Sequence, residues 1–220
     1  VEERRKKDSF LNERQVLQWA NQLCDALIYL HSQSPPVLHR DIKPANIKLT
    51  SGGLIKLVDF GLVKLLATDD ARTITILQGR GTIAYTPLEQ YGGDTGHTDV
   101  RSDIYSLGAT LYHLLTNQPP PDAKHRFLNA KSLIPPRELN PHISIITERA
   151  ILSAIAMHPS ERPQDVKTFK EMLRGHVQPH ALFSLAPLQN VWTQAVQENS
   201  KLLAVAGTML ALAILITLLS

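Results

Sequence analysis

One short run of residues limits the possible folds of this chain more than any other part of it. Residues 39–46 read His-Arg-Asp-Ile-Lys-Pro-Ala-Asn, and the tripeptide Asp59-Phe60-Gly61 begins thirteen positions after Asn46. Transfer of a phosphoryl group needs little covalent help from a protein, but it needs charges placed around the phosphates and their magnesium ions. The run supplies two carboxylates, an ammonium and an amide at short spacing, which favours phosphoryl-transfer chemistry.

Three further motifs follow in order along the chain. Residues 81–90 read Gly-Thr-Ile-Ala-Tyr-Thr-Pro-Leu-Glu-Gln, residues 103–108 read Asp-Ile-Tyr-Ser-Leu-Gly, and residues 158–163 read His-Pro-Ser-Glu-Arg-Pro. With the first two motifs, they resemble the eukaryotic-like (Hanks-type) protein kinases. The matching parts are the catalytic loop, the metal-binding turn, the end of the activation segment, the start of the central helix and an arginine-bearing turn. The usual Ala-Pro-Glu of the family reads Pro-Leu-Glu here, so the proline is displaced by one position.

The resemblance implies catalytic and metal-binding roles for four polar residues. Asp41 would accept or orient the hydroxyl proton of the substrate, and Lys43 would reach the transferring phosphoryl group of ATP. Asn46 and Asp59 would hold Mg²⁺ and, with Lys43, the nucleotide, because both side chains offer the hard oxygen ligands that this ion prefers. His39 is expected to be a packing and hydrogen-bonding residue and not an acid or base.

The resemblance also implies structural roles outside the catalytic residues. Asp103 is expected to brace the backbone of the catalytic loop. Glu89, at the end of the activation segment, is expected to form an ion pair with Arg162.

Arg40 predicts regulation by phosphorylation. A cation next to the catalytic aspartate is a buried positive charge that needs an anion, and a phosphate on the activation segment would supply one. Residues 62–86 contain several threonines, and Thr73 or Thr75 is the expected site. The alternative is that these threonines are ordinary polar loop residues.

The pair Lys43-Pro44 resembles serine/threonine kinases, since tyrosine kinases usually carry Ala-Ala-Arg or a related sequence there. The resemblance therefore implies transfer of the γ-phosphoryl group of ATP to Ser or Thr hydroxyls of protein substrates. The Pro-Leu-Glu-Gln-Tyr sequence and the apolar segment at the end of the chain are most similar to the bacterial receptor-type branch of the family.

The expected fold is mainly α, a kinase large lobe with one small β-hairpin. Apolar residues at helical spacing predict a helix over 13–32, for which Asn12 is the candidate cap. Residues 47–49 and 55–58 flank Ser-Gly-Gly and predict a hairpin that delivers Asp59. Further helices are expected over 103–115, 147–157 and 164–173, and the proline-bearing stretch 119–141 is expected to form loops with one short helix.

Residues 202–219 predict a transmembrane helix, since these eighteen residues are uncharged and mostly apolar and would span about 27 Å as a helix. A buried C-terminal helix is the alternative. Lys201 precedes the segment and no basic residue follows it, which places the kinase lobe in the cytoplasm by the positive-inside rule. The expected organisation is a kinase lobe over 1–174, a juxtamembrane linker over 175–201 and a single pass through the cell membrane.

Composition excludes some other classes of protein. The net charge is only +3, and its densest basic run, residues 4–7, is typical of a solvated chain end, so no nucleic-acid partner is expected. A single cysteine excludes an internal disulfide, and Cys24 lies among apolar residues that predict a core position.

Only twelve residues precede Glu13, which leaves no room for the glycine-rich loop, the strand lysine and the helix glutamate of a kinase small lobe. The sequence therefore predicts a fragment with little activity alone, whose parent is a membrane-anchored kinase that forms transient homodimers for trans-phosphorylation. One alternative is a non-catalytic, kinase-like interaction module tethered to the membrane. Another is a small-molecule phosphotransferase of related fold, which would not be expected to carry the activation segment.

Overall fold

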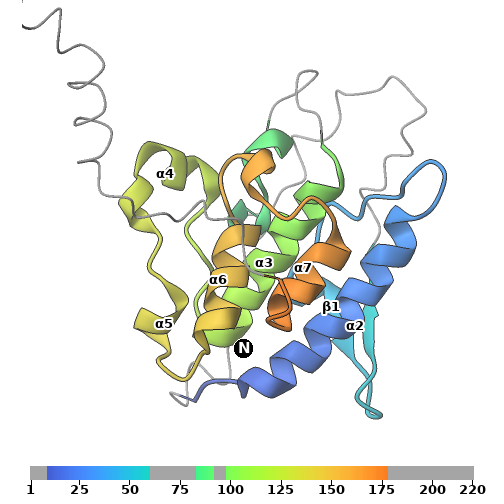
Figure 1. Ribbon diagram of the computed structural model, residues 1–220, viewed down its shortest axis with the longest axis horizontal. Coiled ribbons are helices and arrows are strands. Elements are labelled where there is room, and N and C mark those ends of the chain that lie inside the picture. Colours follow the sequence, from blue (N-terminus) through green and yellow to red (C-terminus); the bar gives the residue numbers. More distant parts are fainter. Residues whose placement is uncertain (1–8, 60–82, 92–97, 178–220) are drawn as a thin grey trace, which may run out of the picture. The chain divides into compact units, whose positions relative to one another are not determined.

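The computed structural model describes residues 9–59, 83–91 and 98–177, which form a group of helices with one two-stranded sheet (Figure 1). The elements in chain order are α2 (Glu13–His31), β1 (Ile47–Leu49), β2 (Ile55–Leu57), α3 (Val100–Thr116), α4 (Ala123–Leu128), α5 (Pro136–Leu139), α6 (Ile145–Ala154) and α7 (Val166–Leu173). Short 3₁₀ turns cover Pro44–Asn46, Ile83–Tyr85, Leu88–Gln90, Ala130–Ser132 and Pro159–Glu161. The predicted mainly α fold with a small hairpin is confirmed.

Helix α2 forms because its apolar residues recur on one face and its first turn is capped. The buried residues of this helix are Val16, Ala20, Leu23, Cys24 and Leu27. The Asn12 side chain accepts a hydrogen bond from the backbone N–H of Gln15, as predicted for an N-cap. Burial raises the pKa of the Cys24 thiol to about 12, so this cysteine is a core residue and no nucleophile at neutral pH.

Helix α3 is the centre of the core and packs against α2, α5, α6 and α7 (Figure 1). Thirteen of its 17 residues are buried, which explains why its sequence is apolar on most sides. Gly108 permits the close approach of α6, because a Cβ atom at this position would lie 2.7 Å from the Cβ of Ala154. The helix begins three residues earlier than predicted, since Asp99 caps it through the backbone N–H of Arg101.

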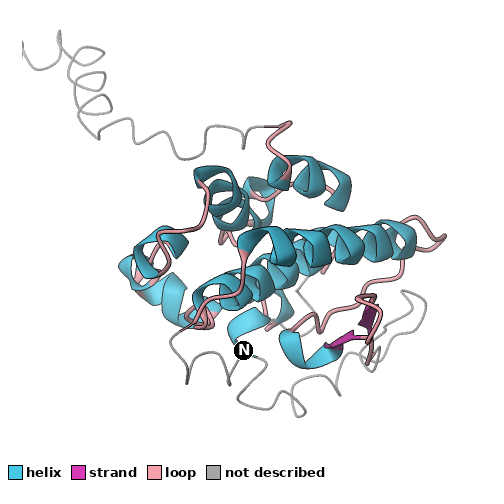
Figure 2. Ribbon diagram, turned by 90° about the horizontal axis from the view of Figure 1, so that it is seen from below, coloured by secondary structure: helices cyan, strands magenta, loops and turns pink. Residues whose placement is uncertain are grey.

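The hairpin lies against α2 at the edge of the group of helices (Figure 2), and its residues Ile47, Ile55 and Leu57 pack against the core. Its strands are antiparallel, with Ile47 paired to Leu57 and Leu49 to Ile55. Gln22 of α2 fixes the hairpin in place: its Oε1 accepts a hydrogen bond from Ile55 N at 2.9 Å. The chain leaves β2 two residues before Asp59, so the hairpin delivers that carboxylate as predicted.

The stretch 119–141 contains two short α-helices, not the single one predicted. Helix α4 begins after Asp122, whose side chain accepts a hydrogen bond from His125 N, and α5 begins at Pro136, a residue suited to a first helical position. Helices of four and six residues are too short for an apolar repeat to reveal them, whereas the capping aspartate and the proline could have. The predicted helices over 147–157 and 164–173 are present with shifted bounds, as α6 and α7.

Most of the predicted linker and the whole predicted span over 202–219 lie outside the described residues. Among the residues that are described, no helix has both the length and the apolar character needed to cross a bilayer.

Candidate active site

The loop between α2 and β1 brings three of the predicted site residues together. Asp41 Oδ2 accepts hydrogen bonds from Lys43 Nζ at 2.8 Å and from Asn46 Nδ2 at 2.9 Å. Asn46 Nδ2 also lies 2.9 Å from the Asp41 carbonyl oxygen. The loop folds back this way because Pro44 starts a 3₁₀ turn that ends at Asn46. An ammonium, an amide and a carboxylate therefore form one cluster.

The two carboxylate oxygens of Asp41 have different surroundings. Oδ2 is held by Lys43 and Asn46, whereas Oδ1 is buried and has no hydrogen-bond partner among the described residues. A buried acceptor is costly to a protein unless a protein donor, a water, an ion or a ligand satisfies it. Oδ1 is thus the carboxylate oxygen of Asp41 to which none of the described residues donates.

Asn46 and Asp59 are the candidate metal ligands. The carbonyl oxygen of Asn46 accepts a hydrogen bond from Val58 N at 2.9 Å. Asp59 is the next residue after Val58, so this bond holds the backbone before Asp59 against the catalytic loop. Asn46 uses its amide nitrogen on Asp41, so its amide oxygen is the atom it can offer to an ion. Two hard oxygen ligands fit Mg²⁺, which keeps several waters in protein sites.

Asp103 braces the catalytic loop, as predicted. Its carboxylate is fully buried in the first turn of α3 and accepts hydrogen bonds from His39 N at 2.9 Å and from Arg40 N at 2.8 Å. A third donor, His31 Nε2 at the end of α2, lies 2.8 Å from the same carboxylate. Arg40 has a φ of 65°, a left-handed conformation that non-glycine residues hold only where their surroundings enforce it.

The Arg40 side chain is buried with its Nε unpartnered among the described residues, where it forms no ion pair. Burial lowers its pKa, and the nearby Asp103 charge opposes that shift. The Arg40 carbonyl oxygen accepts a hydrogen bond from Gln90 Nε2 at 3.2 Å. Within the described part of the chain, this guanidinium has no anion in contact. His39 differs, because burial lowers its pKa and favours the neutral imidazole expected of a packing residue.

The predicted ion pair between Glu89 and Arg162 is confirmed. Arg162 Nη1 and Nη2 donate to Glu89 Oε1 and Oε2 at 2.5 and 3.1 Å. The Arg162 side chain is fully buried, and it also donates to the backbone carbonyls of Ala156 and Met157. Ser102 of α3 donates to Glu89 as well, at 2.9 Å. The segment 83–91 is therefore anchored to the core beside the catalytic loop.

Two residues that contact this site received no role from the sequence. His31 contacts Asp103, 72 positions further along the chain, and Gln90 contacts Arg40, 50 positions before it. No sequence pattern links residues at such separations. The sequence offered one indirect signal for each contact: His31 lies at the end of a predicted helix, and Gln90 directly follows Glu89. The predicted regulatory residues Thr73 and Thr75 and the pair Phe60-Gly61 lie outside the described residues.

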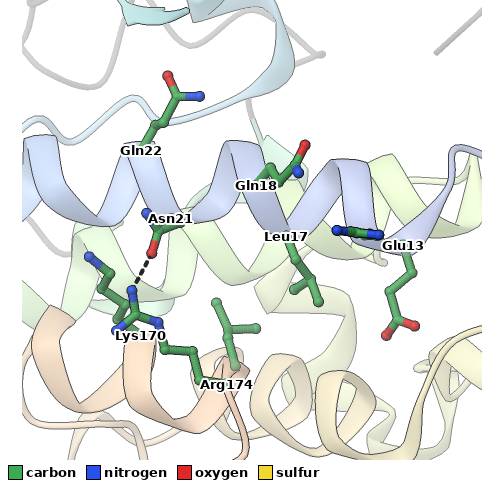
Figure 3. Close-up of a pocket in the computed structure, with 9 residues that line it drawn as sticks. Glu13, Leu17, Gln18, Asn21, Gln22, Lys170 and Arg174 are labelled. Atoms are coloured by element: carbon green, nitrogen blue, oxygen red, sulfur yellow. Dashed lines mark hydrogen bonds between the residues drawn. The ribbon is translucent and has the colours of Figure 1, made fainter. Parts of the chain in front are cut away.

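A separate hollow of about 700 Å³ lies between α2 and α7 (Figure 3). Arg174 Nη2 donates to Asn21 Oδ1 at 2.7 Å across it, as the dashed line shows. No residue of the catalytic loop lines this hollow, so it is distinct from the site around Asp41.

Known proteins with similar sequences are named serine/threonine-protein kinases. Serine/threonine-protein kinase PknB of Mycobacterium leprae is 32% identical over 177 residues, which cover 77% of this chain and 27% of the relative. A probable serine/threonine-protein kinase of Clostridium acetobutylicum is 32% identical over 173 residues, covering 76% and 25%. A solved structure described as PpkA-294 apo form superposes with a TM-score of 0.57 at 29% identity, covering 73% of this chain and 54% of that one.

The chain spans about a quarter of the length of these curated relatives. Residues 1–176 match the family described as protein kinase domain. Because this match extends over most of the 220 residues, the chain belongs to the protein kinase family.

Proposed function

We propose that this chain carries the substrate- and metal-binding half of a serine/threonine protein kinase site. The observation that carries the proposal is the asymmetry of Asp41, whose Oδ2 is held by Lys43 and Asn46 while its buried Oδ1 lacks a partner among the described residues. Relatives named serine/threonine kinases and the pair Lys43-Pro44 support the substrate class.

In the proposed reaction, a Ser or Thr hydroxyl oxygen of the protein substrate attacks the γ-phosphorus of ATP, and its proton passes to Asp41 Oδ1. The bond from the γ-phosphorus to the oxygen that bridges it to the β-phosphate breaks, and ADP leaves with the electron pair. Lys43, fixed beside Asp41, offsets negative charge on the phosphoryl oxygens. Asn46 and Asp59 would hold Mg²⁺, which neutralises phosphate charge when bound.

We also propose that residues 202–219 anchor the protein in the cell membrane as a single pass, with the lobe over 1–174 in the cytoplasm and 175–201 as the linker. The support is the uncharged, apolar composition of the segment and the position of Lys201. Transient homodimers would allow one copy to phosphorylate another.

One experiment tests activity and anchoring together. The full-length protein, as its gene encodes it, is recovered from alkali-washed membranes and incubated with labelled ATP, Mg²⁺ and a general protein substrate. We expect the protein in the washed membranes and label on serine or threonine. Incorporation no higher than that of an Asp41→Asn variant, or label on tyrosine, would contradict the proposed activity. Recovery in the alkaline supernatant would contradict the anchor.

We further propose that the buried Arg40 guanidinium binds a phosphate on the activation segment, at Thr73 or Thr75. Mass spectrometry of active full-length protein is expected to find phosphate within residues 62–86, and phosphatase treatment is expected to slow phosphoryl transfer. An Arg40→Gln variant should lose this sensitivity to phosphatase, because the phosphate then has no buried cation to pair with. An active protein without phosphate in this segment would contradict the proposal.

A further inference from the structure

Thr110 lies in the middle of α3, and its hydroxyl contacts the catalytic loop. The residue is fully buried, and its Oγ1 donates a hydrogen bond to the carbonyl oxygen of Ile42 at 3.3 Å, across 68 positions of the chain. No other donor among the described residues reaches this carbonyl oxygen. Ile42 is also fully buried and stands between Asp41 and Lys43, so the bond acts on the backbone that joins these two site residues.

The hydroxyl of Thr110 points to a different kind of partner from those of its neighbours in α3. A serine or threonine inside a helix can donate to the carbonyl four residues before it. Thr116 bonds in this way to Tyr112 at 2.7 Å. Ser106 does the same to Ser102 at 3.1 Å. Thr110 instead donates out of the helix to the loop, so this buried hydroxyl satisfies a carbonyl that lies outside α3.

The Ile42 carbonyl influences where the side chains on either side of it lie. A peptide unit is planar, so a bond that holds this carbonyl also holds the N–H of Lys43. Lys43 Nζ lies 2.8 Å from Asp41 Oδ2, and the Lys43 carbonyl accepts a hydrogen bond from Asn46 N at 3.0 Å. A shift of this peptide unit would therefore displace the carboxylate, the ammonium and the turn that carries Asn46.

We propose that Thr110 is a positioning residue for phosphoryl transfer, whose hydroxyl holds the peptide unit between Ile42 and Lys43 against α3. This inference rests on the proposed function. The hydroxyl contacts neither nucleotide nor substrate in this role, and it transfers no proton. Because α3 is the centre of the core, a side chain on this helix gives the loop a rigid support.

The test separates the hydroxyl of Thr110 from the shape of its side chain, in the full-length protein. Thr110→Val keeps the branched shape and removes the hydroxyl, whereas Thr110→Ser keeps the hydroxyl and removes a methyl group. We expect Thr110→Val to lower kcat by about threefold to tenfold, the size of effect that one lost neutral hydrogen bond has. KM values for ATP and for a substrate peptide should stay within about twofold. Thr110→Ser should keep kcat near the wild-type value, although the cavity it leaves lowers the melting temperature.

Thr116→Val is the matched control, because it makes the same change at a second buried hydroxyl of α3, whose bonds stay at the end of this helix. It should leave kcat as it is. Amide hydrogen exchange adds a readout that does not depend on activity. The backbone amide of Asn46, which bonds to the Lys43 carbonyl, should exchange faster in Thr110→Val than in the wild type. Thr110→Ser and Thr116→Val should keep its protection.

A kcat of Thr110→Val equal to that of the wild type would overturn the positioning role, as would an equal loss in Thr116→Val. A folded Thr110→Ser variant as slow as Thr110→Val would overturn it as well, since kcat would then follow the shape of the side chain. If Thr110→Val does not fold, Thr110→Ala is compared with Thr110→Ser, because these two differ only in the hydroxyl, and equal kcat values would overturn the role. If the wild-type protein transfers no phosphate, the proposed function fails. Exchange of the Asn46 amide then decides whether Thr110 holds the loop, and equal exchange in Thr110→Val and the wild type would show that it does not.

Discussion

Replacing Asp41 with asparagine is expected to lower kcat for phosphoryl transfer by about 10²- to 10⁴-fold, the usual contribution of a positioned general base. An amide has nearly the size of a carboxylate, and its oxygen can still accept the hydrogen bonds that Lys43 Nζ and Asn46 Nδ2 give to Oδ2. The loop should therefore keep its conformation. What the amide cannot do is accept the hydroxyl proton that we assign to Oδ1.

Initial rates of label transfer from ATP, measured with the full-length protein at several substrate concentrations, check this prediction. Because the change removes an interaction made in the transition state, kcat and kcat/KM should fall together while KM for ATP changes little. Asp25→Asn is the matched control: it makes the same chemical change on the surface of α2, where Asp25 pairs with Lys170. Asp25→Asn should leave kcat as it is. Equal rates for Asp41→Asn and wild type would rule out Asp41 as the base.

Helix α2 and the hairpin could be predicted because short sequence patterns encode them. Helix α2 was predicted with its cap because both its apolar repeat and Asn12 can be seen in the sequence, and Ser-Gly-Gly marked the hairpin turn. The contacts of Asp103 with the loop and of Glu89 with Arg162 join residues far apart in the chain. They were predicted only because the ordered motifs resemble a family in which such contacts occur.

Some contacts and backbone conformations at the site are encoded neither in the apolar periodicity nor in the order of the motifs. The contacts of His31 and Gln90 with the site depend on how α2 and the segment 83–91 pack beside the loop, which no short sequence window encodes. Arg40 and Asp59 both have positive φ although neither is glycine, so composition gives no sign of their left-handed backbone. At these two positions next to the site, tertiary hydrogen bonds override local preference.

The buried Arg162 is expected to carry the largest stability effect of any single side chain discussed for this site. Arg162→Met should lower the free energy of unfolding by about 3–5 kcal/mol, because removing one partner of a buried pair leaves Glu89 without its counter-charge. The carbonyls of Ala156 and Met157 lose their donors as well. Since small domains are stable by only about 5–15 kcal/mol, the variant should unfold at a much lower urea concentration than the wild type.

Arg162→Lys separates charge from geometry. A lysine retains the positive charge but cannot form the two parallel hydrogen bonds to Glu89 while also reaching two carbonyls, so it should recover only part of the lost stability. Arg174→Met is the matched control, since Arg174 pairs with Glu171 on the surface and should contribute less than about 1 kcal/mol. If Arg162→Met shifted the urea midpoint no more than Arg174→Met does, the ion pair would not be what anchors the segment 83–91 beside the catalytic loop.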